Sequence, residues 1–308
     1  MRLVFAGTPE PAVPSLRRLA ASDHDIAAVV TRSDKPVGRK RVLTPSPVAA
    51  AADELGLDVI RADRLDADAT ARITALGADL GVIVAYGGLV REPLLSAPRH
   101  GWINLHFSLL PRWRGAAPVQ HALIAGDAVT GASVFQLVPE LDAGDVFAEE
   151  PFEVPQNATA GDLLAALAVS GAGLLAGVVD AIAAGTAVAS PQSGAVTIAG
   201  KLGDADGAIG WNEPSAAVLG RIRGVTPEPG AHTTVEGARL KILEARDAAS
   251  VADAALAPGE FAFRGRAVLV GTADDPVELV AVQPAGKGVM RAGDWWRGLR
   301  RETLQADS

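Results

Sequence analysis

Three polar residues could do chemistry together: Asn104, His106 and Asp142. The segment Trp102–His106 alternates as a β-strand does, which places Asn104 and His106 on the same face at a spacing of two. An imidazole with an ordinary pKa of about 6.5 can take up or release a proton at neutral pH. An amide can donate a hydrogen bond to a developing oxyanion, and a carboxylate can fix the tautomer of the imidazole, stabilise its cation or hold a water.

The residue types also exclude several kinds of site. The chain has no cysteine, so it has no thiolate nucleophile, disulfide or zinc-thiolate centre. Its 5 histidines show no metal-type spacing, and we expect no metal. Ser108 lies in no nucleophile-elbow pattern. The set suits direct attack by a substrate amine on an acyl group. The alternative is structural, with an Asn-x-His pair that only packs and an aspartate that only caps a turn.

The N-terminal half predicts an α/β fold that would place these residues. A strand over Arg2–Ala6, a turn at Gly7, a helix carried by Val13 and Leu16, and a strand over Ile26–Val30 form a βαβ unit. No further glycines follow Gly7, so the dinucleotide fingerprint is absent. We expect helices over residues 47–55, with Ser46 as N-cap, over 66–76, over 117–125 and over 159–184, and a further helix that begins at about residue 92. We expect strands over 80–85, 102–106 and 131–138, and a last strand that ends at about residue 154.

Two strand ends are expected at one rim of the sheet. Leu80–Ala85 runs into Tyr86, Gly87 and Gly88, and Trp102–His106 runs into a loop that contains Pro111. Ligands of open parallel sheets sit at the carboxyl ends of the strands. The sequence therefore predicts a ligand site at this rim.

The composition changes after residue 184. We expect a first domain over residues 1–184, a linker rich in Ala, Gly, Ser and Pro over 185–206, and a second domain over 207–308. The second domain has short strands separated by turns, which indicates a small β-barrel. The expected strands are 221–223, 232–235, 240–243, 259–263, 267–270 and 277–282.

The charge of the chain is acidic with one basic segment. With 308 residues, a net charge of -8 and a pI near 5.2, the protein would meet a polyanion only through local basic patches. Residues 31–43 carry five basic residues against one acidic residue and are expected to form a loop, either a solvated surface or a binding segment. We see no apolar run of membrane-spanning length, and expect a soluble, unprocessed, cytoplasmic protein with no membrane partner.

Four motifs resemble the methionyl-tRNA formyltransferase family. They are Phe5–Pro9, Asn104–Pro118, Leu141–Asp145 and Gln283–Lys287, so the resemblance covers nearly the whole chain. The Ser108–Pro111 core is shared with the wider set of enzymes that use 10-formyltetrahydrofolate. One departure is Phe107, at a position where many relatives carry a small residue.

The resemblance implies a fold, an activity and a site. The fold would be a Rossmann-like, mostly parallel sheet followed by an OB-like β-barrel. The activity would be formyl transfer from 10-formyltetrahydrofolate to the α-amino group of methionine on initiator Met-tRNA, with Asn104, His106 and Asp142 as the catalytic set. The implied folate residues are Tyr86, Gly87, Gly88, Leu89, Ser108, Leu109, Leu110, Pro111, Val138, Leu141 and Asp145.

The resemblance also implies the partners. Arg39, Lys40 and Arg41 would meet the acceptor arm of the tRNA, and a local basic patch with Lys287 and Arg291 would lie on the barrel. The partners would be initiator Met-tRNA and tetrahydrofolate derivatives, with no DNA, and the protein is expected to be a monomer.

Three other functions compete with this one. The nearest is a related formyltransferase that acts on a small amine, a ribonucleotide or an amino sugar, and it would need neither the basic loop nor a second domain. A folate- or nucleotide-binding oxidoreductase is disfavoured by the absent glycine fingerprint. A noncatalytic RNA-binding module would not require the three polar residues to converge.

Overall fold

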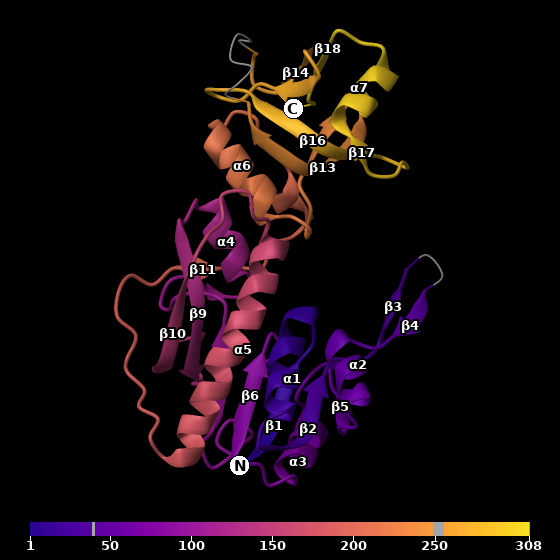
Figure 1. Ribbon diagram of the computed structural model, residues 1–308. Coiled ribbons are helices and arrows are strands. Elements are labelled where there is room, and N and C mark those ends of the chain that lie inside the picture. The colour runs from indigo at the N-terminus through magenta and orange to yellow at the C-terminus, as the bar shows by residue number, and fades with distance from the viewer. Residues whose placement is uncertain (39–40, 249–255, 308) are drawn as a thin grey trace. The chain divides into compact units, whose positions relative to one another are not determined.

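The computed structural model describes residues 1–38, 41–248 and 256–307. Its backbone contacts group the chain into two units (Figure 1). The first comprises Met1–Ala116, Val129–Glu153 and Leu164–Ala199, and the second Ala117–Ala128, Val154–Leu163 and Gly200–Ser308. The grouping interleaves the chain instead of cutting it once, and the domain limits expected at 184 and 206 stay a prediction.

The first unit is built on one seven-stranded sheet with the strand order β10-β9-β7-β6-β1-β2-β5. The neighbours from β7 to β5 are parallel, whereas β9 is antiparallel to β7 and β10 is antiparallel to β9. This confirms the mostly parallel sheet expected from the sequence. The strands are β1 Arg2–Gly7, β2 Asp25–Thr31, β5 Val59–Arg61, β6 Leu80–Val84, β7 Trp102–His106, β9 Val129–Gln136 and β10 Val146–Glu153.

Capping residues set the starts of the helices in this unit. Ser46 Oγ accepts a hydrogen bond from Ala49 N at 3.0 Å, as the sequence predicts, and Asp66 Oδ1 accepts one from Ala69 N at 3.0 Å. The short helices are η1 Glu10–Ala12, α1 Val13–Ala20, α2 Pro47–Glu54 and α3 Ala67–Thr74. The helix expected from Glu92 is wrong, because residues 92–96 form turns.

The basic segment is a β-hairpin and not a plain loop. Strand β3 (Lys35–Val37) pairs antiparallel with β4 (Val42–Thr44). The turn between them holds Gly38 with φ 71° and Arg41 with φ 49°, and Arg39 and Lys40 lie outside the described residues. The local sequence did not reveal the pairing because the three residues on each side are too few to show an alternation.

Helix α5 (Ala160–Ala184) is the longest element, and its start and end agree with the prediction. Its 25 residues and a mean hydropathy of 2.0 over 18 of them would suffice to span a membrane, so the expectation of no such run is wrong. Half of that window is buried in the protein, as in the core helix of a globular fold. A Cβ at Gly171 would lie 3.1 Å from Leu105 and 3.6 Å from Ala132, which places this face of the helix against β7 and β9.

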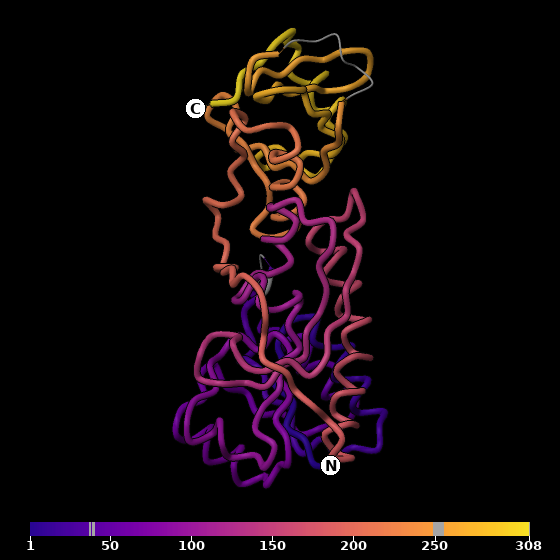
Figure 2. The backbone as a smooth tube through the Cα atoms, turned by 90° about the vertical axis from the view of Figure 1, so that its left-hand side faces the viewer, coloured from indigo at the N-terminus to yellow at the C-terminus, as the bar shows by residue number. Residues whose placement is uncertain are grey.

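After α5 the chain returns along the first unit as an extended segment that ends in β11 (Ile198–Ala199) (Figure 2). β11 pairs in parallel with β8 (Arg114–Gly115). Residues of the expected linker thus form part of the first unit.

The second unit is an antiparallel sheet with the order β12-β13-β16-β15-β14-β18, with β17 paired to β16. An antiparallel bridge between Val235 and Ala306 joins its two ends, consistent with the expected barrel. The strand predicted over 221–223 is wrong. It lies in α6, whose buried Val218 and Ile222 fall on one face. The elements are α4 Pro118–Ile124, η2 Asp204–Gly207, α6 Ser215–Gly224, β12 His232–Val235, β13 Ala238–Asp247, β14 Glu260–Arg264, β15 Ala267–Val270, β16 Val277–Pro284, β17 Met290–Arg291, α7 Ala292–Leu299 and β18 Thr303–Gln305.

The close approach of Gly81 to Trp102 generates a stability prediction. A Cβ on Gly81 in β6 would lie 2.1 Å from the fully buried Trp102 ring, whose Nε1 donates to Leu94 O at 2.9 Å. We expect Gly81→Ala to lower the free energy of unfolding by about 2 kcal/mol or more through overpacking. Gly173→Ala, on an exposed face of α5 with no atom within 4 Å of the new Cβ, is expected to raise it by up to about 1 kcal/mol. Urea unfolding followed by circular dichroism measures both. Equal stability of the two variants would contradict the packing argument.

Candidate active site

The site begins at the carboxyl end of β7, between β6 and β9. Asn104 is paired with Ile83 on one side and Phe135 on the other, and His106 lies opposite Ser133. Asn104 Oδ1 is buried and has no hydrogen-bond partner among the described residues. A buried amide oxygen without a partner is costly, so this atom is available to a ligand that donates a hydrogen bond.

The tautomer of His106 is set by its surroundings. Its Nε2 lies 2.8 Å from the carbonyl oxygen of Trp113, and a carbonyl only accepts, so Nε2 carries the proton and donates it. In the neutral ring Nδ1 is then the atom with the lone pair, and it lies 3.8 Å from Asp142 Oδ2. The ring also packs edge-on against Phe135, with centroids 6.3 Å apart. The free proton-accepting position of the imidazole therefore faces the carboxylate.

Burial decides the charge of this imidazole. His106 is 6% exposed, and removal from water lowers its pKa below the ordinary value, while the Asp142 carboxylate and the hydrogen bond to Trp113 act in the opposite direction. The ring is accordingly neutral at neutral pH. A proton taken up at Nδ1 would be stabilised by the nearby carboxylate.

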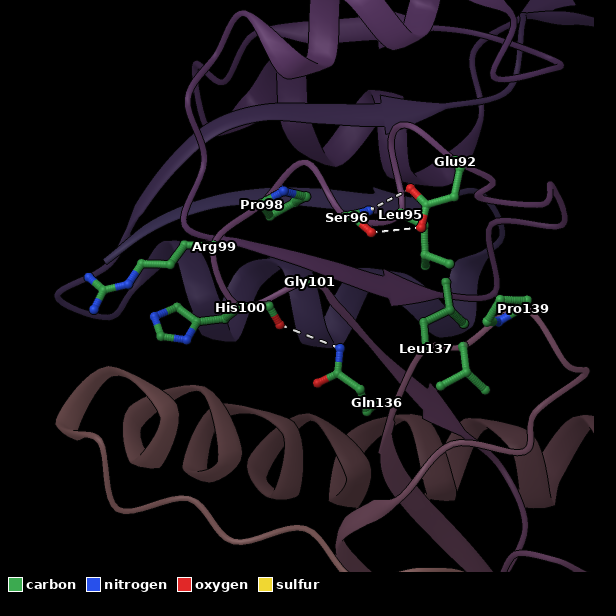
Figure 3. Close-up of a pocket in the computed structure, with 11 residues that line it drawn as sticks. Glu92, Leu95, Ser96, Pro98, Arg99, His100, Gly101, Gln136, Leu137 and Pro139 are labelled. Carbon is green, nitrogen blue, oxygen red and sulfur yellow. Dashed lines mark hydrogen bonds between the residues drawn. The ribbon is translucent and has the colours of Figure 1, made fainter.

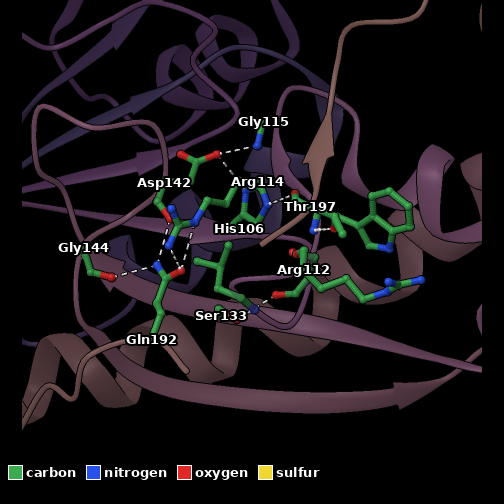
Figure 4. Close-up of polar contacts among 12 residues, drawn as sticks. His106, Arg112, Arg114, Gly115, Ser133, Asp142, Gly144, Gln192 and Thr197 are labelled. Atoms are coloured by element: carbon green, nitrogen blue, oxygen red, sulfur yellow. Dashed lines mark hydrogen bonds and ion pairs between the residues drawn. The ribbon is translucent and has the colours of Figure 1, made fainter. Parts of the chain in front are cut away.

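Asp142 comes from the loop between β9 and β10. Its backbone is in the left-handed region, with φ 45°. Its Oδ2 accepts a hydrogen bond from Gly115 N at 2.7 Å, and its side chain is 12% exposed (Figure 4). Strand β7 and this loop thus bring His106 and Asp142 together as the sequence predicts, with Asn104 two residues earlier on the same strand.

The loop after β7 is held by its own polar groups. Ser108 Oγ donates to Arg112 O at 2.6 Å, and Leu110 N donates to Ser133 Oγ at 3.1 Å. Ser133 Oγ is also 2.7 Å from Ser108 O. Of the four residues expected to form a folate wall here, Ser108, Leu110 and Pro111 are buried and Leu109 is half-buried. The loop is therefore a rigid part of the first unit.

The turn after β6 presents little side-chain surface. Tyr86 is buried, its hydroxyl donates to Ala62 O at 2.6 Å, and burial raises its pKa. A Cβ on Gly88 would lie 2.5 Å from the Tyr86 ring, so this position needs glycine. Gly87 has φ 77°, whereas Leu89 is 65% exposed. A ligand at this turn would meet backbone groups and Leu89, and not the phenol.

Two cavities flank the segment between Gln136 and Asp145. One of about 420 Å³ is lined by Glu92, Leu95, Ser96, Pro98, Arg99, His100, Gly101, Gln136, Leu137, Val138 and Pro139 (Figure 3). The other, of about 510 Å³, is lined by Gln136, Val138, Glu140, Ala143, Gly144, Asp145, Phe147 and Ala189. Val138 lines both and Asp145 the second, while Asn104, His106 and Asp142 line neither. Leu141, which lies between Val138 and Asp145 in the sequence, is exposed.

The residues expected to bind tRNA lie on exposed surfaces where the structure describes them. Arg41, Lys287 and Arg291 are exposed, the last at the end of β17. Within residues 1–38, 41–248 and 256–307, no cluster of three or more His, Asp or Glu side chains is arranged to hold a metal ion.

Sequence reasoning missed the residues that support this site from the expected linker. Gln192 Nε2 donates to the carbonyl oxygens of Asp142 and Gly144, and Thr197 Oγ1 accepts from Trp113 N at 2.8 Å (Figure 4). A Pro-Gln pair in an Ala- and Ser-rich stretch gives no local signal of such contacts.

Comparisons with known proteins agree along the whole chain. The formyl transferase family matches residues 1–179, and the formyl transferase C-terminal domain matches residues 201–300. A methionyl-tRNA formyltransferase of Clavibacter sepedonicus is 64% identical over 99% of this chain and 100% of its own, and one of Leifsonia xyli subsp. xyli is 61% identical over 99% of each.

The fold comparison points in the same direction. The crystal structure of WlaRD, a sugar 3N-formyl transferase in the presence of dTDP and 5-N-formyl-THF, matches with a TM-score of 0.69 at 14% identity, over 94% of this chain and 99% of that one. At that identity the likeness concerns the fold alone. The full-length relatives are decisive: the chain belongs to the formyl transferase family and, within it, to the methionyl-tRNA formyltransferases.

Proposed function

We propose that the protein transfers the formyl group of 10-formyltetrahydrofolate to the α-amino group of methionine on initiator Met-tRNA. The observation that carries the proposal is the buried His106, with Nε2–H fixed on a carbonyl and Nδ1 turned to Asp142. The folate would be a cosubstrate that supplies the formyl carbonyl. The buried Asn104 Oδ1, which has no partner among the described residues, can accept a hydrogen bond from the N–H of the attacking amine, while the NH₂ group of the same amide can donate to the formyl oxygen.

The residues of this chain would act on the formyl oxygen and on the proton that the attacking amine loses. As the neutral amine attacks the formyl carbon, the Asn104 amide stabilises the developing tetrahedral centre by hydrogen bonding. His106 Nδ1 accepts the proton that the amine loses, directly or through a water, and Asp142 stabilises the imidazolium. The same proton then goes to the folate nitrogen as its bond to the formyl carbon breaks, so the enzyme ends unchanged. α-Amino groups titrate at about pH 8, so a strong base is unnecessary.

The expected folate residues lie along the rim of the first unit. Three features support folate binding there. They are the exposed Leu89 with the backbone of its turn, the loop Ser108–Pro111, and the segment from Val138 to Asp145 with its two cavities. We also propose that Arg39, Lys40 and Arg41 of the basic segment, with Lys287 and Arg291 on the second unit, bind tRNA phosphates. A monomer in the cytoplasm remains the expectation.

The acceptor assay tests the proposal directly. With 10-formyltetrahydrofolate as donor, we expect kcat/KM for initiator Met-tRNA to exceed that for elongator Met-tRNA by about 10-fold or more, and a small amino sugar or amino ribonucleotide to react least. The three acceptors are compared in parallel by following formation of tetrahydrofolate. Faster transfer to the small amine would overturn the tRNA assignment and favour a small-molecule formyltransferase.

Substitutions at the buried pair test the catalytic roles. We expect His106→Ala and Asp142→Asn to lower kcat by about 10²- to 10⁴-fold, since both remove support for proton transfer. His121→Ala, a matched change on α4, is expected to leave kcat unchanged. Steady-state formyl transfer measures the three variants, with circular dichroism to verify folding.

The pH dependence of kcat tests the direction in which the pKa of His106 is shifted. The acceptor amine gives the acid side of the kcat profile one ionisation at about pH 8, and because burial lowers the pKa of His106, that residue should add a second ionisation below about pH 6.5. Asp142→Asn removes an interaction that raises the pKa of His106, so this second ionisation should move to lower pH in its residual activity. A second ionisation that moves to higher pH, or full activity of His106→Ala, would refute the assigned base.

The hairpin generates a prediction about salt. Changing Arg39, Lys40 and Arg41 to Gln should raise KM for Met-tRNA and make the slope of log(kcat/KM) against log salt shallower by roughly 2 to 3, with KM for the folate unchanged. A control with the same charge change, Arg18, Arg64 and Arg72 to Gln, alters exposed positions in and before the short helices and should keep the slope. An unchanged slope in the hairpin variant would exclude phosphate contacts at the hairpin.

A further inference from the structure

Gln192 connects two parts of the candidate site. Its Nε2 lies 2.8 Å from Asp142 O and 2.9 Å from Gly144 O, and its Oε1 lies 3.1 Å and 2.6 Å from Nε and Nη2 of Arg114 (Figure 4). The side chain thus makes four hydrogen bonds, two through each end of its amide. Its partners are 48 to 78 residues away in sequence.

These partners fix the orientation of the amide. A guanidinium only donates hydrogen bonds and a backbone carbonyl only accepts them. The amide oxygen must therefore face Arg114, and the NH₂ group must face the Asp142 loop. Glutamine satisfies both sides at once, whereas a glutamate would keep the guanidinium and place a carboxylate against two carbonyl oxygens.

The contacts close a ring around Asp142. Arg114 precedes Gly115, whose N–H donates to Asp142 Oδ2 at 2.7 Å, and Gln192 returns from Arg114 to the Asp142 carbonyl. The backbone and the carboxylate of Asp142 are therefore held by one connected set of hydrogen bonds. Such support is needed because Asp142 has φ 45°, a left-handed conformation that is unfavourable for a residue with a Cβ.

The segment that carries Gln192 is itself anchored in the first unit. Ser190 and Val146 exchange backbone hydrogen bonds of 2.9 Å and 2.8 Å. On the other side of Gln192, Arg114 N donates to Thr197 O at 2.9 Å and Ala116 N donates to Ala199 O at 2.9 Å. Gln192 is therefore presented from a fixed backbone and can position what it binds.

We propose that Gln192 is a positioning residue for formyl transfer, which holds the Asp142 loop so that its carboxylate stays at His106 Nδ1. The inference rests on the proposed function, because Asp142 is taken there to stabilise the protonated ring. Gln192 would touch no reacting atom. Its effect passes through the backbone of Asp142 and Gly144, and Gly144 allows no shift toward the sheet, since a Cβ there would lie 1.8 Å from Gln136 O.

Two substitutions separate the donor side of the amide from its acceptor side. We expect Gln192→Ala and Gln192→Glu each to lower kcat by about 10- to 100-fold, with KM for Met-tRNA unchanged. Gln192→Glu keeps an ion pair with Arg114 and loses both donated bonds, so a loss in this variant assigns the effect to the loop. Gln156→Ala, at an exposed position, is the matched control and should retain full activity.

Two readouts distinguish positioning from general stability. Gln192→Ala should have little further effect on kcat when Asp142→Asn is already present, because both changes remove the same interaction. In an NMR titration, the pKa of His106 should fall in Gln192→Ala in the same direction as in Asp142→Asn. Additive losses in the double variant, or a His106 titration unmoved by Gln192→Ala but moved by Asp142→Asn, would overturn the inference.

The NMR experiment needs no substrate, so it also separates this inference from the proposed function. If the unmodified protein formylates no Met-tRNA but His106 shifts as expected, the function is wrong and the positioning stands. If transfer is lost in Asp142→Asn and both Gln192 variants keep full activity and an unshifted His106, only the positioning is wrong.

Discussion

The burial of one imidazole beside one carboxylate is the constraint on which the site depends. An ionisable group withdrawn from water needs partners, and His106 is 6% exposed. Strand β7 supplies none of them: the carbonyl of Trp113 serves Nε2 and the Asp142 carboxylate faces Nδ1. Both loops must be in place for the buried ring to keep these partners. Strand β7 therefore requires two further segments of the chain around His106, and neither can be inferred from the sequence of the strand itself.

The strand order explains how the second of these segments arrives. Because β9 runs antiparallel to β7, the chain leaves β9 beside Ile103 and must turn back before β10, and Asp142 lies in that return. The return is tight. Gly144 lies so near Gln136 that a side chain would clash, and Asp142 takes a left-handed backbone conformation. The antiparallel strands β9 and β10 are thus joined by the loop that places the Asp142 carboxylate at His106.

The sequence predicted correctly those features that depend on residues close together in the chain. The alternation before His106, the cap at Ser46 and the extent of α5 are confirmed, since each depends on neighbours within one turn or strand. Where short runs were ambiguous the prediction failed, as for residues 221–223, which lie in a helix, and for Glu92, which starts only turns. The largest omission is the segment from Gln192 to Ala199. It resembled a linker because its partners, such as Arg114 at a separation of 78 residues, leave no periodic pattern nearby. The pairing of β8 with β11 holds the end of this segment in the first unit.

In the proposed reaction, the chemistry and the choice of acceptor fall on different residues. Asn104, His106 and Asp142 need only a carbonyl and a neutral amine, so nothing in this set distinguishes a tRNA from a small molecule. Selection must come from charge elsewhere, and the chain has a net charge of -8. A polyanion is therefore repelled on average and attracted only within about 8 Å of a basic cluster at physiological salt. Arg41 on the hairpin and Lys287 and Arg291 on the second unit are exposed cations of this kind. Under the proposed function, an RNA that reaches several of these basic clusters at once would bind more tightly than an RNA that reaches one, without any change at β7.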